Sequence, residues 1–311
     1  MKTQAILMER PKALKFSALS LVDPKDGDVV VSVRQSGIST GTERLLWSGR
    51  MPPFPGMGYP LVPGYETVGE VIETTEGAGI DVGTQVFVPG ANCFTEARGL
   101  FGGAASQLVV PAKRLHEVPQ GIGEEAVLLA LAATARHALT GAERLPEVVV
   151  GHGVLGRLIA RIATAMGAAP LVWETNETRH GDARGYCVVK PEDDDRQDYA
   201  AIMDVSGDAQ ILDTLIGRLA PGGEIALAGF YAERLGFDFP AAFMREARMR
   251  IAAEWKPDDM AAVLRMVADG RLALDGLITH RATPENAEAA YRTAFEDPAC
   301  LKMIFDWRSL S

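Results

Sequence analysis

A glycine-rich hexapeptide in the middle of the chain constrains the fold more than any other feature. Residues 151–156 read Gly-His-Gly-Val-Leu-Gly, which is a GxGxxG pattern. A predicted strand at 147–150, with three valines after Glu147, precedes it, and residues 154–166 carry apolar side chains at helical spacing. Between a strand and a helix, such glycines allow a tight turn, close approach to a pyrophosphate and close helix packing. This context predicts a dinucleotide-binding α/β domain rather than an unrelated glycine-rich turn.

The residues after this hexapeptide indicate which dinucleotide binds. Glu174 ends the next predicted strand, where a carboxylate can bind the adenosine ribose hydroxyls and repel a 2′-phosphate. This favours NAD over NADP, although Arg179 nearby leaves room for NADP. The pyrophosphate is expected at the N-terminus of the following helix. His152 is as easily an ordinary loop residue as a cofactor contact. The candidate cofactor contacts are Gly151, His152, Gly153, Val154, Leu155, Gly156, Glu174, Ser206 and Gly229.

The chain of 311 residues has the length of about two domains and changes character along its course. Residues 1 to about 120 hold short β runs broken by glycine and proline, which predicts a β-rich domain, a partly open barrel. From Gly123 predicted strands alternate with helices, which is typical of a parallel doubly wound sheet. We therefore predict a β-rich domain over 1–127 and 256–311, and a Rossmann-type domain over 128–255. The individual predictions include helices over 124–138, 258–268 and 284–295, strands over 277–279 and 301–305, and a turn at 221–223.

Composition narrows the classes of function. The net charge of −10, from 31 basic and 41 acidic residues, argues against a nucleic-acid binder, because counterion displacement needs basic patches. No apolar stretch reaches the roughly 20 residues of a membrane-spanning helix, and the first residues lack the apolar core of a signal peptide. The three cysteines are too few and too scattered for a disulfide framework or a cysteine-rich zinc site. A reducing, cytoplasmic compartment is the simple expectation.

The order of a β-rich domain, a dinucleotide-binding domain and a returning chain resembles the medium-chain dehydrogenase/reductase superfamily. The resemblance covers essentially the whole chain. It implies a GroES-like first domain, hydride transfer with a nicotinamide cofactor, and Thr134 near the nicotinamide. It also implies a possible homodimer, in which the strand over 250–255 pairs edge to edge. The segments that carry the resemblance are 63–71 (the glycine–histidine–glutamate segment), 134–139 (the helix before the cofactor domain), 274–280 (the return strand) and 301–305 (the closing strand).

The chain departs from the zinc-containing members of that superfamily at every ligand position. Their first cysteine falls within residues 37–43, which contain none, and their histidine position is occupied by Tyr65. Their second cysteine falls near Ala130, and only Cys93 lies where the four cysteines of the structural zinc lobe would be. Because zinc in proteins is held by thiolates, imidazoles and carboxylates, we expect no metal. A zinc-free member has to polarise the substrate oxygen by hydrogen bonds.

Hydroxyl groups of the first domain are the candidates for that task. Tyr65 can donate to a developing alkoxide, although a barrel tyrosine bonded to the backbone is an equal interpretation. Thr42 stands where the family often places a relay hydroxyl, in a segment that is one residue longer here. Ser39 and Thr40 lie beside it, but serine and threonine in such a segment are more typical of turns. The resemblance gives Glu66 a supporting role behind the site.

A long loop over residues 45–60 is rich in proline, glycine, aromatic residues and methionine. It could form a soft, flat, apolar wall, although the same composition fits a surface loop whose aromatic side chains fill the local core. Phe94, Leu100 and Phe101 could add a second wall, and arginines at the rim could bind a carboxylate. The composition favours a large, flat, apolar, acidic ligand. The candidate pocket residues are Trp47, Arg50, Phe54, Met57, Tyr59, Phe94 and Phe101.

Residues 36–71 resemble, more narrowly, dehydrogenases of bacteriochlorophyll biosynthesis. This resemblance implies a chlorin-type tetrapyrrole substrate, whose C3 1-hydroxyethyl side chain is oxidised to acetyl with NAD as acceptor. The flat macrocycle and its propionate would match the loop and the arginines. Two alternatives stay open. One is a zinc-free quinone or enone reductase of the same fold, which would favour NADPH. The other is a protein that binds NAD or a pigment without turnover.

Overall fold

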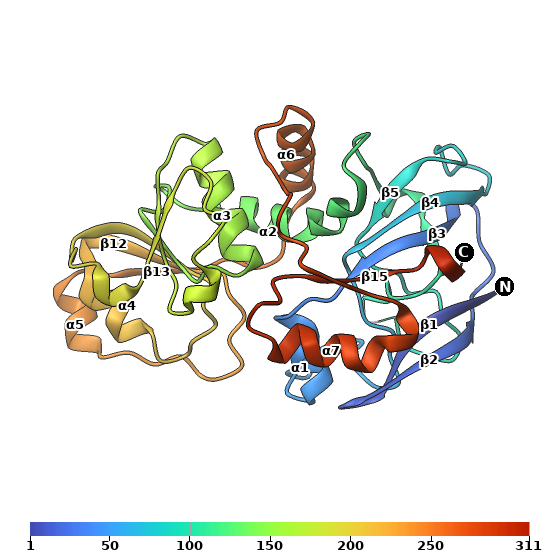
Figure 1. The fold of residues 1–311 in the computed structure, drawn as a ribbon, viewed down its shortest axis with the longest axis horizontal. Coiled ribbons are helices and arrows are strands. Elements are labelled where there is room, and N and C mark those ends of the chain that lie inside the picture. The colour runs from blue at the N-terminus through green and yellow to red at the C-terminus, as the bar shows by residue number, and fades with distance from the viewer. Residues whose placement is uncertain (100, 311) are drawn as a thin grey trace. The chain divides into compact units, whose positions relative to one another are not determined.

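The computed structural model describes residues 1–99 and 101–310 and divides into two compact units (Figure 1). The first unit comprises Met1–Ala130 and Leu277–Ser311, and the second comprises Leu131–Gly276. Residues 256–276, which we expected in the first domain, belong to the second unit. They are held there by side chains of two helices. His137 Nδ1 lies 2.8 Å from Asp259 Oδ2, and Arg161 donates to the carbonyls of Ala273 and Asp275.

The first unit is β-rich and antiparallel for the most part. Strands β1 (Lys2–Arg10) and β2 (Ala13–Ser20) form a two-stranded sheet. A seven-stranded sheet has the order β14 (His280–Ala282), β15 (Met303–Asp306), β3 (Asp28–Gly37), β4 (Thr67–Thr74), β5 (Gln85–Val88) and β7 (His116–Glu117), with β6 (Gln107–Pro111) also paired to β3. The valines of β3 are fully buried, as expected for β-branched residues in a strand that pairs on both sides.

Two helices of the first unit come from opposite ends of its sequence and pack together. Helices α1 (Thr42–Ser48) and α7 (Ala287–Glu296) lie side by side in Figure 1, and the rings of Trp47 and Phe295 are 5.6 Å apart. The predicted helix over 124–138 divides into a 3₁₀ turn, η2 (Gly123–Leu128), and an α-helix, α2 (Leu129–Thr140). The predicted strand at 277–279 is wrong, because chain pairing begins three residues later, in β14. The remaining 3₁₀ turns of this unit are η1 (Ala112–Arg114), η5 (Pro284–Asn286) and η6 (Arg308–Leu310).

The second unit contains one six-stranded sheet in which all neighbours are parallel. Counted from β8 the strand order is 3-2-1-4-5-6, which is that of a Rossmann fold. The sheet order is β10 (Cys187–Val189), β9 (Leu171–Trp173), β8 (Val148–Val150), β11 (Tyr199–Asp204), β12 (Leu219–Leu227) and β13 (Arg248–Ile251). The helices are α2, of which all but the first two residues belong to this unit, α3 (Val154–Ala165), α4 (Leu212–Arg218), α5 (Phe239–Met244) and α6 (Pro257–Ala268). The short turns are η3 (Glu177–Arg179) and η4 (Pro191–Asp193).

The prediction of a Rossmann-type parallel sheet joined to a β-rich domain is confirmed. Two local details differ from expectation. The predicted turn at 221–223 lies within β12, where the pairing with β11 jumps from Leu219 to Glu224. The predicted strand over 250–255 is instead β13, which ends at Ile251. Within the described residues, no helix is long and apolar enough to cross a membrane.

Candidate functional site

The glycine-rich loop of the second unit connects β8 to α3. Gly151 has φ +103°, a conformation that favours glycine. A Cβ on Gly156 would overlap with the carbonyl oxygen of Gly151, so glycine is needed for α3 to begin so close to β8. A Cβ on Gly153 would meet none of the described residues within 4 Å, so a ligand has room there. Since no side chain caps the N-terminus of α3, its first N–H groups can bind an anion. The loop therefore fits a pyrophosphate.

Glu174 follows β9, and two backbone N–H groups fix its carboxylate. Oε2 accepts a hydrogen bond from the His152 N–H at 3.0 Å, and Oε1 accepts one from the Asn176 N–H at 2.8 Å. The residue is only 8% exposed. Each carboxylate oxygen can accept more than one hydrogen bond, so Glu174 retains acceptor capacity for ribose hydroxyls. The carboxylate is thus fixed beside the loop that fits the pyrophosphate.

The ring of His152 contacts the segment after β9. Nδ1 lies 2.6 Å from the Arg179 carbonyl oxygen, and Nε2 lies 2.9 Å from the Tyr186 hydroxyl. Burial and the nearby Arg157 guanidinium lower the pKa of His152 to about 4, so the ring is neutral at pH 7. The neutral ring donates from Nδ1 to the carbonyl and accepts at Nε2 from the phenol. Its side chain therefore binds Arg179 and Tyr186, while its backbone N–H binds Glu174.

The other three candidate cofactor residues lie on separate elements of the second unit. Ser206 is exposed after β11, and its Cα would lie 3.3 Å from a Cβ placed on Gly151. Gly229 follows β12 and donates its N–H to the Asp204 carbonyl oxygen. Since the carboxyl ends of parallel strands share one edge of the sheet, Ser206 and Gly229 lie along the edge that carries the glycine-rich loop. Thr134 is half-buried on α2.

Three hydroxyl groups of the first unit meet at Tyr65. Its phenol oxygen lies 2.5 Å from Ser39 Oγ and 3.5 Å from Thr42 Oγ1. Burial, and secondly the charge of Glu66, raise the pKa of Tyr65 well above its ordinary value, so the phenol stays protonated. The Phe101 ring packs edge-on against it, with ring centroids 5.0 Å apart. We call Ser39, Thr42 and Tyr65 the hydroxyl cluster. Thr40 is half-buried in the turn before α1.

Two buried carboxyl groups accompany the hydroxyl cluster. Glu66 is 0% exposed, and its Oε2 lies 2.6 Å from Nζ of Lys302, which is 1% exposed. The Lys302 ammonium also donates to the Ile38 carbonyl oxygen at 3.1 Å. Glu43 is 1% exposed and accepts hydrogen bonds from the Ser39 N–H at 3.2 Å and from the Tyr291 hydroxyl. The buried ion pair and the buried acid therefore surround the segments that carry the hydroxyls.

Glu43, Lys302 and Tyr291 were not among the site residues predicted from the sequence. A lysine in the otherwise apolar run Leu-Lys-Met-Ile-Phe was a signal that could have found Lys302, because a charge in a buried strand needs a partner. The sequence around Glu43 and Tyr291 carries no comparable signal.

The candidate pocket residues fall into two groups. Trp47, Met57 and Tyr59 are partly buried against the core of the first unit, and the Tyr59 hydroxyl donates to the Leu46 carbonyl oxygen. Phe94 is a buried core residue. Arg50 and Phe54 are exposed, and Phe101 packs on Tyr65. Leu100 lies outside the described residues. The aromatic residues of the loop over 45–60 thus serve partly as core.

The ligand positions of the zinc-containing superfamily members carry a different set of groups here. Ser39 and Tyr65, from the segments that hold two of those positions, hydrogen-bond to each other. An alcohol and a protonated phenol are not ligands that zinc prefers. In the part of the chain that the structure describes, no three His, Cys, Asp or Glu side chains group together in a way that could hold a metal ion.

Comparison with known proteins places these features in a family. Residues 25–120 match the family described as the alcohol dehydrogenase GroES-like domain. The chain is 55% identical over 311 residues to 2-desacetyl-2-hydroxyethyl bacteriochlorophyllide A dehydrogenase of Rhodobacter capsulatus, and 53% identical over 316 residues to that of Cereibacter sphaeroides. Each alignment covers 99% of both chains. The crystal structure of 2R,3R-butanediol dehydrogenase from Bacillus subtilis has the same fold, with a TM-score of 0.84 at 20% identity, covering 98% of this chain and 99% of that one.

A GroES-like domain joined to a Rossmann sheet with a dinucleotide loop defines a medium-chain dehydrogenase/reductase. The predicted resemblance to that superfamily is confirmed. With more than half of its residues identical to both relatives over nearly their whole length, the chain belongs to the 2-desacetyl-2-hydroxyethyl bacteriochlorophyllide A dehydrogenase family.

Proposed function

We propose that this chain oxidises the C3 1-hydroxyethyl side chain of a bacteriochlorophyllide to acetyl, with NAD as the hydride acceptor. The observation that carries this proposal is the identity of 55% and 53% to dehydrogenases named for that substrate, over 99% of the chain. The reaction removes a hydride from the carbinol carbon and a proton from its oxygen. NAD supplies the hydride-accepting nicotinamide when it is bound.

The second unit holds the cofactor in this proposal. The N–H groups at the start of α3 and the open space at Gly153 receive the pyrophosphate. Glu174 accepts hydrogen bonds from the ribose hydroxyls. Because its carboxylate is fixed by two N–H groups, it cannot turn aside to make room for a 2′-phosphate without losing both. This supports NAD over NADP.

The first unit handles the oxygen of the alcohol. Tyr65 remains a neutral phenol, so it can donate a hydrogen bond to an oxygen that becomes negative as its proton leaves. Ser39 and Thr42 hold the phenol oxygen and can pass on a proton. We propose that this cluster performs, without zinc, the polarisation that a metal performs in other members of the superfamily.

The substrate surface of this proposal is built from the partly buried aromatic residues. Trp47, Tyr59 and Phe101 offer flat apolar area for a macrocycle, and Met57 can adapt to its outline. The exposed guanidinium of Arg50 can bind a propionate.

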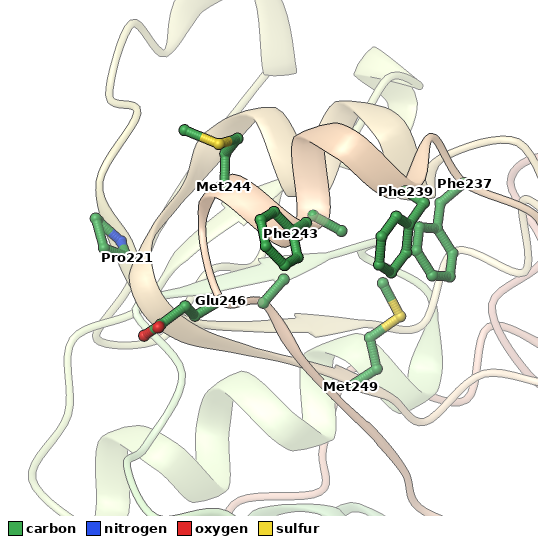
Figure 2. A pocket seen from close by; sticks show the side chains of 9 residues that line it. Pro221, Phe237, Phe239, Phe243, Met244, Glu246 and Met249 are labelled. Atoms are coloured by element: carbon green, nitrogen blue, oxygen red, sulfur yellow. The ribbon is translucent and has the colours of Figure 1, made fainter.

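We also propose that two copies of the chain associate through the second unit, in a reducing cytoplasmic compartment. Strand β13 is the last in the order of its sheet. Beside it, Figure 2 shows the rings of Phe237, Phe239 and Phe243 and the side chains of Met244 and Met249 around one pocket. All five side chains are more than a third exposed, and a second copy pairing through β13 would cover them. Sedimentation of the wild type and of Phe243→Glu tests this, because the substituted chain should sediment as a monomer.

Turnover tests the function directly. Chelator-treated protein is mixed with the 3-(1-hydroxyethyl) chlorophyllide and either NAD or NADP, and the red-region absorption of the pigment is followed. The expected result is a spectral shift that requires a nicotinamide cofactor, survives chelation and is faster with NAD. No shift despite demonstrated NAD binding would overturn the pigment assignment and direct attention to quinones and enones.

A further inference from the structure

A buried carboxyl group of the first unit has no part in the reaction proposed above. Glu43 is the second residue of α1, and each of its oxygens receives one hydrogen bond. One donor is the backbone N–H of Ser39, and the other is the hydroxyl of Tyr291 on α7. A buried acid is costly unless its oxygens are hydrogen-bonded, so this arrangement is specified by the fold. Ser39 is the important partner, because its own hydroxyl binds Tyr65.

The groups that face Glu43 come from three other segments, two of which carry a charge. Glu66 precedes β4, Lys302 precedes β15, and the neutral phenols Tyr65 and Tyr291 complete the surroundings. The Lys302 ammonium donates to Glu66 and to the Ile38 carbonyl. Burial, together with the charge of Glu66, raises the pKa of Glu43 to about 7, although Tyr291, Ser39 and Lys302 act in the opposite direction.

The combined charge of Glu43, Glu66 and Lys302 therefore depends on whether Glu43 carries a proton. With Glu43 protonated, the ion pair of Glu66 and Lys302 leaves the three residues neutral. With Glu43 ionised, they carry one negative charge in a region shielded from water, where electrostatic interactions are strong. In alcohol oxidation the oxygen becomes negative as its proton leaves. An extra negative charge behind the hydroxyl cluster opposes that change.

We propose that Glu43 is a positioning residue for this reaction: it holds Ser39 against Tyr65, and its own charge state sets the cost of negative charge on the alcohol oxygen. This inference rests on the proposed function and adds a regulatory group to the same site. Glu43 acts through Ser39 and through the local potential. The favourable state is the protonated one, so ionisation of Glu43 slows oxidation.

The test compares Glu43→Gln with the wild type. Glutamine keeps the shape and a hydrogen-bond acceptor but carries no charge at any pH. The measured quantity is the ratio of kcat for the variant to kcat for the wild type, from pH 6 to pH 8.5, because pH effects common to both enzymes cancel. The expected ratio rises at least threefold over this range, since only the wild type gains the charge. Glu70→Gln, on β4 and paired with Arg34, is the matched control and should give a flat ratio.

A second variant shifts the pH at which Glu43 ionises instead of removing its charge. The Tyr291 hydrogen bond lowers the pKa of Glu43, so Tyr291→Phe raises that pKa. The loss of rate that the wild type shows as Glu43 ionises should then appear at higher pH in Tyr291→Phe. A purely structural role for Glu43 would lower kcat in both variants by factors that do not change with pH.

An unfolding measurement separates failure of this inference from failure of the proposed function. The pKa of Glu43 is about 7 in the folded chain, above its ordinary value of 4.5, so the folded state binds more protons between about pH 4.5 and pH 7. Wild-type stability in urea should therefore fall as pH rises through that window, and Glu43→Gln should lack this part of the fall. A flat kcat ratio with normal wild-type turnover would overturn the role of Glu43. Absence of wild-type turnover would overturn the proposed function and this role with it, while the urea result would still report the buried carboxyl.

Discussion

Replacing Lys302 with methionine removes one partner of a fully buried ion pair. Methionine has a similar length, so the main loss is the ammonium group. Glu66 is 0% exposed and would keep its carboxylate without the donor that now lies 2.6 Å from Oε2. Its other oxygen, Oε1, already has no hydrogen-bond partner among the described residues. The Ile38 carbonyl oxygen would also lose its donor from this side chain.

The expected cost follows from this geometry. Removing one partner of a buried ion pair destabilises a protein by about 3–5 kcal/mol, because an uncompensated charge is left behind. For domains of about 150–250 residues, each kcal/mol lowers Tm by about 2–4 °C. Lys302→Met should therefore lower the Tm of the first unit by about 6–20 °C. The double variant with Glu66→Gln removes both charges and should cost less than Lys302→Met alone.

The assay is thermal and urea unfolding followed by tryptophan fluorescence. Trp47 and Trp307 lie in the first unit and report on it. Lys15→Met is the matched control, because Lys15 and Glu9 form an exposed pair at 3.8 Å, and such pairs contribute at most about 1 kcal/mol. The reasoning is refuted if Lys302→Met costs no more than this control, or if the double variant is less stable than Lys302→Met.

Three further substitutions test the proposed reaction. Tyr65→Phe removes the phenol donor and should lower kcat about tenfold or more in the pigment assay, and full activity would exclude Tyr65 from the chemistry. Glu174→Ala should reduce the preference for NAD, measured as the ratio of kcat/KM with NAD to that with NADP, and an unchanged ratio contradicts the cofactor assignment. Gly156→Ala should weaken NADH binding in a fluorescence titration, because the added Cβ would overlap with the Gly151 carbonyl oxygen. Gly236→Ala is the control, because a Cβ at Gly236 meets no described residue within 4 Å.

The second unit could be predicted well because its signals are local. The glycine-rich loop, the strand before it and the apolar spacing after it lie within 20 consecutive residues, and each is dictated by backbone geometry. The parallel order of the sheet then follows from the alternation of strands and helices. The predicted strand at 277–279 failed for the opposite reason. Its apolar residues suit a strand, but the pairing of His280–Ala282 with β15 depends on a partner more than 20 residues away.

The candidate site was predictable only in part. Ser39, Thr42 and Tyr65 were candidates from their positions, but their hydrogen bonds could not be read from spacing. Glu43 and Tyr291 are 248 positions apart, and no pattern in either segment indicates that they meet. A pKa near 7 requires that burial and the neighbouring Glu66 be known, and both are consequences of tertiary packing. The sequence therefore indicated the hydroxyl groups and Glu66 as candidates, but not Glu43, Lys302 or Tyr291, which complete the buried charges around them.

The charge balance of the first unit would make such groups important for the proposed reaction. A metal dication would stabilise a developing alkoxide strongly enough to reduce the importance of one nearby carboxylate. The hydroxyl cluster offers only neutral donors, and the buried ammonium of Lys302 is already balanced by Glu66. Because the neighbouring donors are neutral and the ion pair is balanced, a negative charge on Glu43 would change the electrostatic potential at the hydroxyl cluster strongly. A site built from hydroxyl groups is therefore expected to be more sensitive to the protonation of its buried acid than a metal site of the same fold, and the pH dependence of the Glu43→Gln ratio measures that sensitivity.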